Sequence, residues 1–93
     1  MDRAITSRIP VTELLAGLAE ECAELAQAAL KLRRCFDGTN PTPKDHEEQY
    51  DCLLEEIGDV ELYLDQLSIN RIVIADYKKA KLERWKKRLE GRK

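Results

Sequence analysis

The sequence predicts an all-α protein, an antiparallel helical bundle that is completed by oligomerisation. Three stretches carry apolar residues at every third or fourth position, which is the spacing of one helix face. The chain has one Trp, one Phe and three Tyr, so its core must come from Leu, Ile, Val and Ala, which suits helix packing. A chain of 93 residues forms one domain, residues 1–93. Because such a domain buries only about 60–65% of its unfolded surface, we expect further copies to complete the core.

The first long helix is expected over residues 12–35, in a stretch rich in Ala, Leu and Glu. Thr12 can cap the exposed amides with its side-chain hydroxyl. Residues 1–11 can add only a short turn, because Pro10 interrupts any longer helix. The apolar stripe of the first helix carries a carboxylate where leucine would be expected. It consists of Leu14, Leu18, Glu21, Leu25, Ala28 and Leu32.

The stretch from Asp37 to Pro43 holds a glycine, an asparagine and two prolines, so no helix can continue through it. The second helix is expected over residues 43–67, with Thr42 as its cap. Its stripe consists of Leu53, Ile57, Val60, Leu64 and Leu67. The residues that flank this stripe closely enough to be drawn inward are Glu56, Asp59 and Tyr63. Gly58, in the middle, indicates tight packing of a neighbouring helix or the approach of a ligand.

The third helix is expected over residues 71–90, capped by Asn70 and ended by Gly91. Its inward stripe consists of Ile74, Lys78, Leu82, Trp85 and Leu89. Lys78 either neutralises a carboxylate on a facing helix or meets a bound phosphate.

Charge is distributed unevenly along the chain. Residues 1–77 hold 7 Lys or Arg and 16 Asp or Glu, whereas residues 78–93 hold 9 and 2. A basic terminal helix behind an acidic body indicates a nucleic-acid tail, an electrostatic clamp on the body, or groups that bind a phosphate ligand.

The cysteines and the hydrophobic segments indicate where the protein is located. Cys22, Cys35 and Cys52 are odd in number and widely spaced, so they predict neither a disulfide framework nor a zinc site. No stretch approaches the roughly 18 uncharged residues of a membrane span, and the first residues do not resemble a signal peptide. We therefore expect a cytoplasmic protein without a membrane partner.

Two acidic pairs carry the functional signal. Glu21 and Glu24 share one helix face, Glu56 and Asp59 share another, and each pair adjoins an apolar stripe, so four carboxylates could converge. Each pair alone is more simply a solvated helix face, since 37% of the residues are charged. Two pairs beside two apolar stripes favour a cation site, because buried like charges need compensation.

The ligand types indicate which cation is bound. Carboxylates without histidine or cysteine favour Mg²⁺, with Mn²⁺ possible. A di-iron site requires Glu-x-x-His pairs, and His46 has proline three positions before it. Mg²⁺ held by carboxylates commonly handles polyphosphates, so the predicted mechanism is in-line attack of a metal-activated water on a nucleotide phosphoryl group.

The motif EECAE at Glu20–Glu24, within EECAELAQA, and the motif EEIGD at Glu55–Asp59, within LLEEIGDVELYL, resemble those of a known family. They are similar to the motifs of the MazG-like all-α nucleoside triphosphate pyrophosphohydrolases. The resemblance implies Mg²⁺-dependent hydrolysis of a nucleoside or deoxynucleoside triphosphate to the monophosphate and pyrophosphate. It also implies a four-helix arrangement completed as a homodimer or homotetramer.

The resemblance also implies roles for particular residues. The implied metal ligands are Glu21, Glu24, Glu56 and Asp59. Glu20 and Glu55 would bind a further ion, orient water or act as the catalytic base. The basic segment KKAKLERWKKR resembles the phosphate-contacting helix of the family. The substrate-binding residues implied there are Lys78, Lys81 and Arg84.

Two other classes of function remain open on the sequence. A helical interaction module without catalysis would tolerate loss of Glu21 and Asp59. A nucleic-acid-binding protein would use the basic C-terminal residues and would lose affinity steeply with salt, but this partner is the least expected.

Overall fold

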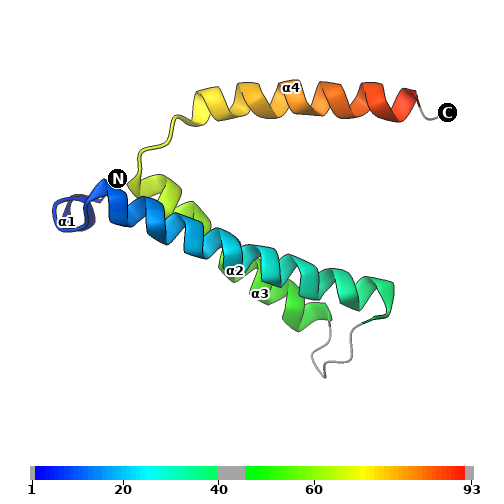
Figure 1. Cartoon of the computed structure of the whole chain (residues 1–93), viewed down its shortest axis with the longest axis horizontal. Helices are drawn as coiled ribbons and strands as arrows, with labels where there is room; N and C mark the ends of the chain where they lie inside the picture. Colours follow the sequence, from blue (N-terminus) through cyan, green and yellow to red (C-terminus); the bar gives the residue numbers. More distant parts are fainter. Residues whose placement is uncertain (1, 40–45, 92–93) are drawn as a thin grey trace.

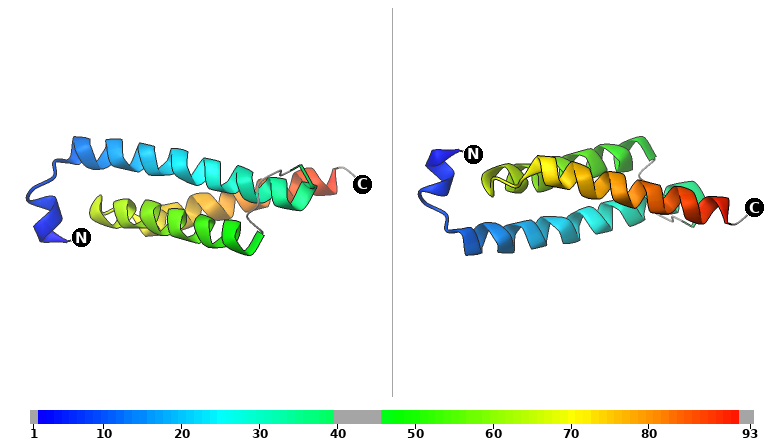
Figure 2. Two further views of the ribbon diagram at one scale, coloured as in Figure 1. Left: turned by 90° about the horizontal axis from the view of Figure 1, so that it is seen from below. Right: turned by 90° about the horizontal axis from the view of Figure 1, so that it is seen from above.

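The structure is a computed structural model that describes residues 2–39 and 46–91. Its elements are α1 (Arg3–Thr6), α2 (Val11–Asp37), α3 (His46–Gln66) and α4 (Arg71–Glu90). Within these described ranges every regular element is a helix, so the predicted all-α class is confirmed. Helices α2 and α3 lie antiparallel and side by side, while α4 runs apart from them (Figures 1 and 2).

Helix α2 differs from the prediction at both ends. Its N-cap is Pro10, and no side chain caps it, so the prediction that Thr12 is the cap is wrong. Pro10 already has an extended backbone, which places Thr12 inside the first turn. At the other end the helix continues to Asp37, where Gly38 adopts φ +76° and donates its N–H to the carbonyl of Arg34. Glycine reaches this left-handed conformation at little cost, which makes it a common helix stop.

The other helix ends agree with the sequence where they can be compared. Asn70 caps α4, because its side-chain oxygen accepts from the amides of Ile72 and Val73 at 3.1 Å each. The short N-terminal turn is α1, capped by the Asp2 carboxylate. The predicted capping role of Thr42 lies outside the described residues.

The contact between α2 and α3 forms the core of the described chain. All six residues of the stripe predicted for the first helix lie in this contact, with Leu14 and Ala28 buried and the others half-buried. Four of the five residues predicted for the second stripe are half-buried, namely Leu53, Val60, Leu64 and Leu67. The fifth, Ile57, is 39% exposed, whereas Gln49 is only 3% exposed, so the buried face of α3 is centred nearer Glu56 than predicted. The buried and half-buried residues of α3 include Gln49, Cys52, Glu56, Asp59, Tyr63 and Gln66. Inward placement of Glu56, Asp59 and Tyr63 is therefore confirmed, and inclusion of Ile57 in the core is wrong.

Tyr63 of α3 packs directly against Gly17 of α2. A Cβ added to Gly17 would lie 2.5 Å from Cζ and 2.6 Å from the hydroxyl oxygen of Tyr63, closer than real atoms allow. The ring of Tyr63 therefore lies directly against the backbone of α2. Gly17 is four residues from Glu21, and Tyr63 is four residues from Asp59, so the ring contact sets the register of the acidic residues one turn away.

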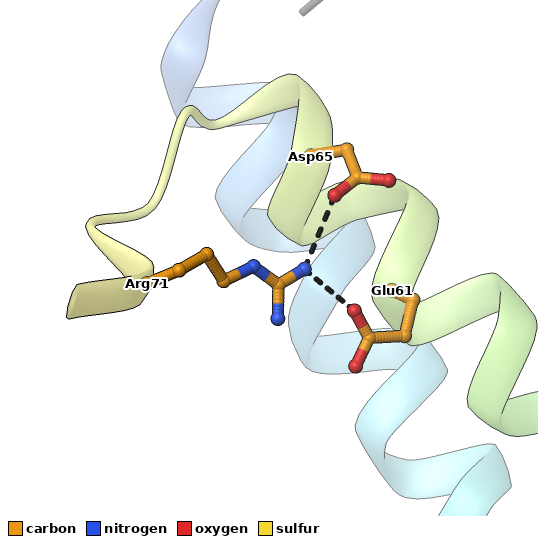
Figure 3. A network of polar contacts seen from close by, with 3 residues as sticks. All are labelled: Glu61, Asp65 and Arg71. Carbon is orange, nitrogen blue, oxygen red and sulfur yellow. Dashed lines mark hydrogen bonds and ion pairs between the residues drawn. The ribbon is translucent and has the colours of Figure 1, made fainter. Parts of the chain in front are cut away.

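Arg71 fixes the connection between α3 and α4 (Figure 3). Its guanidinium group contacts the carboxylates of Glu61, at 2.5 Å, and of Asp65, at 3.1 Å. These two carboxylates raise the pKa of Arg71, so its charge is secure. Ser68 turns the chain with φ +53°. All three charged side chains are about half exposed, so solvent screens each pair strongly and the pairs serve mainly to orient the start of α4.

Helix α4 does not pack as predicted. Its stripe was expected to face the core, yet Leu82 and Trp85 are each 48% exposed and Leu89 is 63% exposed. The prediction is wrong for the described chain because α4 diverges from the α2–α3 pair after Arg71 (Figure 1). Across residues 2–39 and 46–91, no helix is both long enough and apolar enough to cross a membrane.

Gly58 also differs from expectation. A Cβ built on it meets no atom within 4 Å in the part of the chain that the structure describes. The expected close approach of a neighbouring helix or ligand is therefore absent from this part of the single chain, because Gly58 lies on the exposed side of α3.

The two helical glycines should respond oppositely to substitution by alanine. Gly58→Ala should stabilise the protein by about 0.5–1 kcal/mol through helix propensity, since the added methyl group meets open space. Gly17→Ala should instead destabilise it by about 1–3 kcal/mol, because the methyl group must displace the Tyr63 ring. Urea unfolding followed by circular dichroism measures both changes. Equal shifts for the two variants would contradict the ring contact.

Candidate metal centre

Three of the four predicted ligands converge. Glu21 on α2 and Glu56 and Asp59 on α3 each place a carboxylate oxygen so that the three oxygens lie within 4.8 Å of one another. All three side chains are half-buried. They meet because Glu21 lies in the stripe of α2 that packs on α3, while Glu56 and Asp59 lie on the facing side of α3. We call these three residues the carboxylate cluster.

The cluster is electrostatically unfavourable without a cation. Loss of water around the side chain raises the pKa of Glu21, and the charges of Asp59, Glu56 and Glu24 raise it further. Loss of water likewise raises the pKa of Glu56, with contributions from the charges of Asp59, Glu24 and Glu55. Both carboxyls therefore hold their protons more tightly than an isolated glutamate does.

One atom of the cluster has an unmet requirement. The Oε2 atom of Glu56 is buried, and within the described residues it has no hydrogen-bond partner. Over the same residues, no ion pair joins a member of the cluster to Lys or Arg. A buried carboxylate oxygen without a donor is costly, although a hydrogen bond between the Glu21 and Glu56 carboxyls offsets part of the repulsion.

The other predicted acidic residues surround the cluster. Glu20, Glu24 and Glu55 are exposed and are not part of the group of three. The two motifs have the same spacing, so on antiparallel helices packed face to face their outer carboxylates rotate toward the same side. We call this side, formed by Glu20, Glu24, Glu55 and Asp59, the acidic mouth.

The predicted phosphate-binding residues lie elsewhere. Lys78, Lys81 and Arg84 are exposed on α4, which diverges from the α2–α3 pair (Figures 1 and 2). No ion pair joins Lys78 to a carboxylate among the described side chains, so the prediction that it neutralises one is wrong for a single chain. Lys81 instead places Nζ 5.5 Å from the centroid of the Trp85 ring, a cation–π distance.

Two hollows lined by described residues do not coincide with the cluster. One hollow of about 570 Å³ lies beside the α3–α4 connection, and its lining includes Asp2, Asp65 and Arg71. Another of about 590 Å³ lies between the C-terminal part of α2 and the N-terminal part of α3. Neither hollow is lined by a carboxylate of the cluster, so the candidate site is defined by its three carboxylate oxygens and not by a cavity.

The geometry suits a hard cation. Oxygen ligands on one octahedral Mg²⁺ lie ~3–4 Å apart, given metal–oxygen distances of about 2.0–2.1 Å. The 4.8 Å limit found here is close to that spacing, so small rotations of the carboxylates would bring them into range. Three protein oxygens also leave coordination positions for water and for phosphate oxygens, as is usual for Mg²⁺.

Sequence reasoning missed Gly17. A glycine one turn before Glu21, within strong helix formers, was the available signal for a side chain lying against α2. It did not indicate that the side chain belongs to Tyr63, because that depends on how the two helices pack.

No protein family, curated protein or solved structure compared with the chain matches it. The fold and the site therefore define an all-α protein with a carboxylate cluster between two antiparallel helices.

The raised pKa values predict how stability depends on pH. A carboxyl whose pKa rises on folding favours the folded state below the ordinary value of 4.5, and this contribution is lost as pH rises through the folded-state pKa. Without divalent cations, Glu21→Gln should therefore lose less thermal stability than the natural protein between pH 4.5 and neutrality. Thermal unfolding in chelator, followed by circular dichroism at several pH values, measures this difference.

The control is Glu83→Gln, which removes an exposed carboxylate of α4 away from the cluster. Hydrogen bonds from Thr39 lower the pKa of Asp37, so this residue changes the pH dependence of stability in the opposite direction. Its contribution is the same in the natural protein and in both variants, so it does not affect the comparison. Parallel curves for the natural protein and Glu21→Gln would show that the cluster does not couple folding to protonation.

Proposed function

We propose that this chain is a Mg²⁺-dependent nucleoside triphosphate pyrophosphohydrolase of the MazG-like kind. The observation that carries the proposal is the buried Oε2 of Glu56, which has no donor among the described residues and lies in a cluster with Glu21 and Asp59. A cation bound by these oxygens would give the Glu56 Oε2 atom a partner. It would also offset the repulsion that contributes to the raised pKa values of Glu21 and Glu56. The motif resemblance adds the reaction class.

In this proposal, different carboxylates bind the metal ion and orient the attacking water. Glu21, Glu56 and Asp59 hold the ion, while Glu24, exposed at the acidic mouth, is placed to join them when substrate arrives. Bound Mg²⁺, or Mn²⁺ in its place, would supply neutralisation of phosphate charge and a more acidic water. Glu20 and Glu55 are exposed at the same mouth, where a carboxylate can orient a water molecule and accept its proton.

The reaction that this supports is hydrolysis between the α and β phosphates. An oxygen of water bonds to the α phosphorus, and the bond from that phosphorus to the bridging oxygen breaks. The electron pair leaves with pyrophosphate, and the nucleoside monophosphate remains. The choice of the α phosphorus rests on the resemblance, since the cluster can hold an ion beside any phosphate of the chain.

A second part of the proposal concerns assembly. We expect the α2–α3 pair to form half of a MazG-like bundle, which a further copy completes in a homodimer or homotetramer. The few buried residues of the described chain support this, because Leu14 and Ala28 are the only buried apolar ones there. We also keep the expectation of a cytoplasmic location.

Substitution of the cluster tests the activity. Asp59→Asn and Glu56→Gln should each lower pyrophosphate release from a panel of nucleoside triphosphates with Mg²⁺ by about 100-fold or more. Both changes preserve side-chain size and remove a charge, so the helices should remain folded by circular dichroism. Glu83→Gln is the matched control and should keep full activity. Release of orthophosphate instead of pyrophosphate, or unchanged turnover in both variants, would contradict the proposal.

Metal binding can be tested without turnover. Mg²⁺ that binds only the folded state stabilises it by about 2.7 kcal/mol at 100 times its dissociation constant. The natural protein should therefore unfold at a higher temperature as Mg²⁺ is added, and Asp59→Asn should not respond. A non-catalytic interaction module, the main alternative given the exposed stripe of α4, predicts no difference between the two.

A further inference from the structure

Half of the aromatic side chains of this protein, counting histidine, gather in one place. The sequence holds one Phe, three Tyr, one Trp and one His. Three of these six rings line the hollow of about 590 Å³ between the end of α2 and the start of α3. We call this hollow, with its six lining residues, the aromatic hollow. Its lining consists of Leu32, Phe36, His46, Glu47, Tyr50 and Asp51.

The rings of the aromatic hollow do not belong to the core. Phe36 is 74% exposed and Tyr50 is 51% exposed. The ring of Phe36 meets that of His46 edge to face, with the centroids 5.3 Å apart and the planes inclined by 61°. This contact joins α2 to α3 and forms one wall of the hollow. Exposed aromatic rings gathered around a hollow are typical of a surface that binds a partner, because binding removes their large apolar area from water.

The charged groups of the aromatic hollow are acidic. Glu47 and Asp51 are exposed there, and its described lining includes no Lys or Arg. Glu47 lies in the first turn of α3, where the helix dipole alone favours a carboxylate. Asp51 lies one turn further along, next to Tyr50, so the dipole does not account for it. Carboxylates beside ring faces attract a cation both through their charge and through the quadrupole of the rings.

The chemistry of the lining selects an organic cation over a metal ion or a nucleotide. Among the described residues, the group of acidic oxygens that converges closely enough for a metal is the carboxylate cluster, and no residue of the aromatic hollow belongs to it. Glu47 and Asp51 would repel a ligand that carries phosphates. A guanidinium group is planar, stacks on aromatic rings and pairs with carboxylates through two parallel hydrogen bonds.

A cation carried by a peptide fits the aromatic hollow better than a free small cation. The volume of about 590 Å³ is larger than one guanidinium group fills, and most of the lining side chains are exposed. A free small ion would therefore keep much of its contact with water and bind weakly. The methylene groups of an arginine side chain can cover Leu32 and the ring of Phe36, while its charged end reaches Asp51.

We propose that the aromatic hollow binds an arginine side chain of a partner protein, with the guanidinium group stacked against the rings of Phe36 and Tyr50 and paired with Asp51. At 1.5 Å per residue, Leu32 lies about 16 Å along α2 from Glu21, so this site is separate from the carboxylate cluster. It places a protein contact at the end of the α2–α3 pair farthest from α1 (Figure 1). The inference does not depend on the proposed hydrolysis.

A short peptide of glycine and serine with two central arginines tests this proposal. The comparison peptide carries citrulline, which has the shape of arginine without its charge. Phe36 and His46 are the only residues of their types in the sequence, so composition alone identifies their ring resonances in NMR spectra. With Mg²⁺ present, the arginine peptide should shift both sets of resonances saturably, and the citrulline peptide should shift neither. Equal affinity for the two peptides would overturn the proposal.

Substitutions locate the binding site, with affinity measured by fluorescence anisotropy of a dye-labelled arginine peptide. Phe36→Leu removes a ring but keeps an apolar side chain, and should weaken binding about 2–5-fold. Glu47→Gln/Asp51→Asn should weaken it about 10-fold or more, because the charged hydrogen bonds are lost. The matched control is Asp76→Asn/Glu83→Gln, which removes two exposed carboxylates from α4 and changes the net charge equally. Equal weakening by both double variants would show attraction to net charge alone, against the proposal.

Three further measurements separate the alternatives. Spermidine supplies a free organic cation, and adenosine supplies a nucleobase without phosphates. Tighter binding of spermidine than of the arginine peptide, or larger ring shifts with adenosine, would overturn the assignment to an arginine side chain. Asp59→Asn lies outside the aromatic hollow and should bind the peptide as the natural protein does, whether or not the protein hydrolyses nucleotides. Loss of peptide binding in this variant would place the peptide at the carboxylate cluster and end the proposal.

Discussion

The antiparallel packing of α2 on α3 is the constraint on which the rest of this structure depends. It gives each helix an inward stripe, and in both stripes the position nearest the middle is a carboxylate rather than an apolar residue, Glu21 in one and Glu56 in the other. Hydrophobic burial on either side holds these charges together against their repulsion. The Gly17–Tyr63 contact prevents the helices from sliding to a register that would separate them. The cluster is thus a strained element that packing maintains.

The second organising feature is the separation of charges of opposite sign. The carboxylates lie on the α2–α3 pair. The lysines lie on α4, which Arg71 anchors to Glu61 and Asp65 and which runs apart from that pair (Figure 1). If both signs met within one chain, they would neutralise each other and leave little field for a ligand. Kept apart within one chain, the carboxylates and the lysines do not neutralise each other. The apolar stripe of α4 remains half exposed, because no other described helix packs on it.

Much of the fold follows from sequence periodicity, but the packing of the helices does not. The stripe of α2, the Asn70 cap and the inward position of Asp59 were predictable because they depend on spacing within one helix. The stripe of α3 was predicted except at Ile57, which is exposed, while Glu56 beside it is half-buried. The Tyr63 ring lies against Gly17 of the other helix, and no local pattern encodes such a contact between helices. The outward course of α4 likewise depends on two carboxylates ten and six residues before Arg71.

Helix α2 ends at Asp37 and α3 begins at His46, at one end of the α2–α3 pair, whereas the acidic residues lie near its middle. The left-handed turn at Gly38 ends α2 before the connection begins. Lengthening such a connection twofold costs only about 0.6 kcal/mol in closure entropy. Insertions there should be inherited easily, and relatives of this protein could differ widely in the distance between the two motifs while preserving the same arrangement of oxygens.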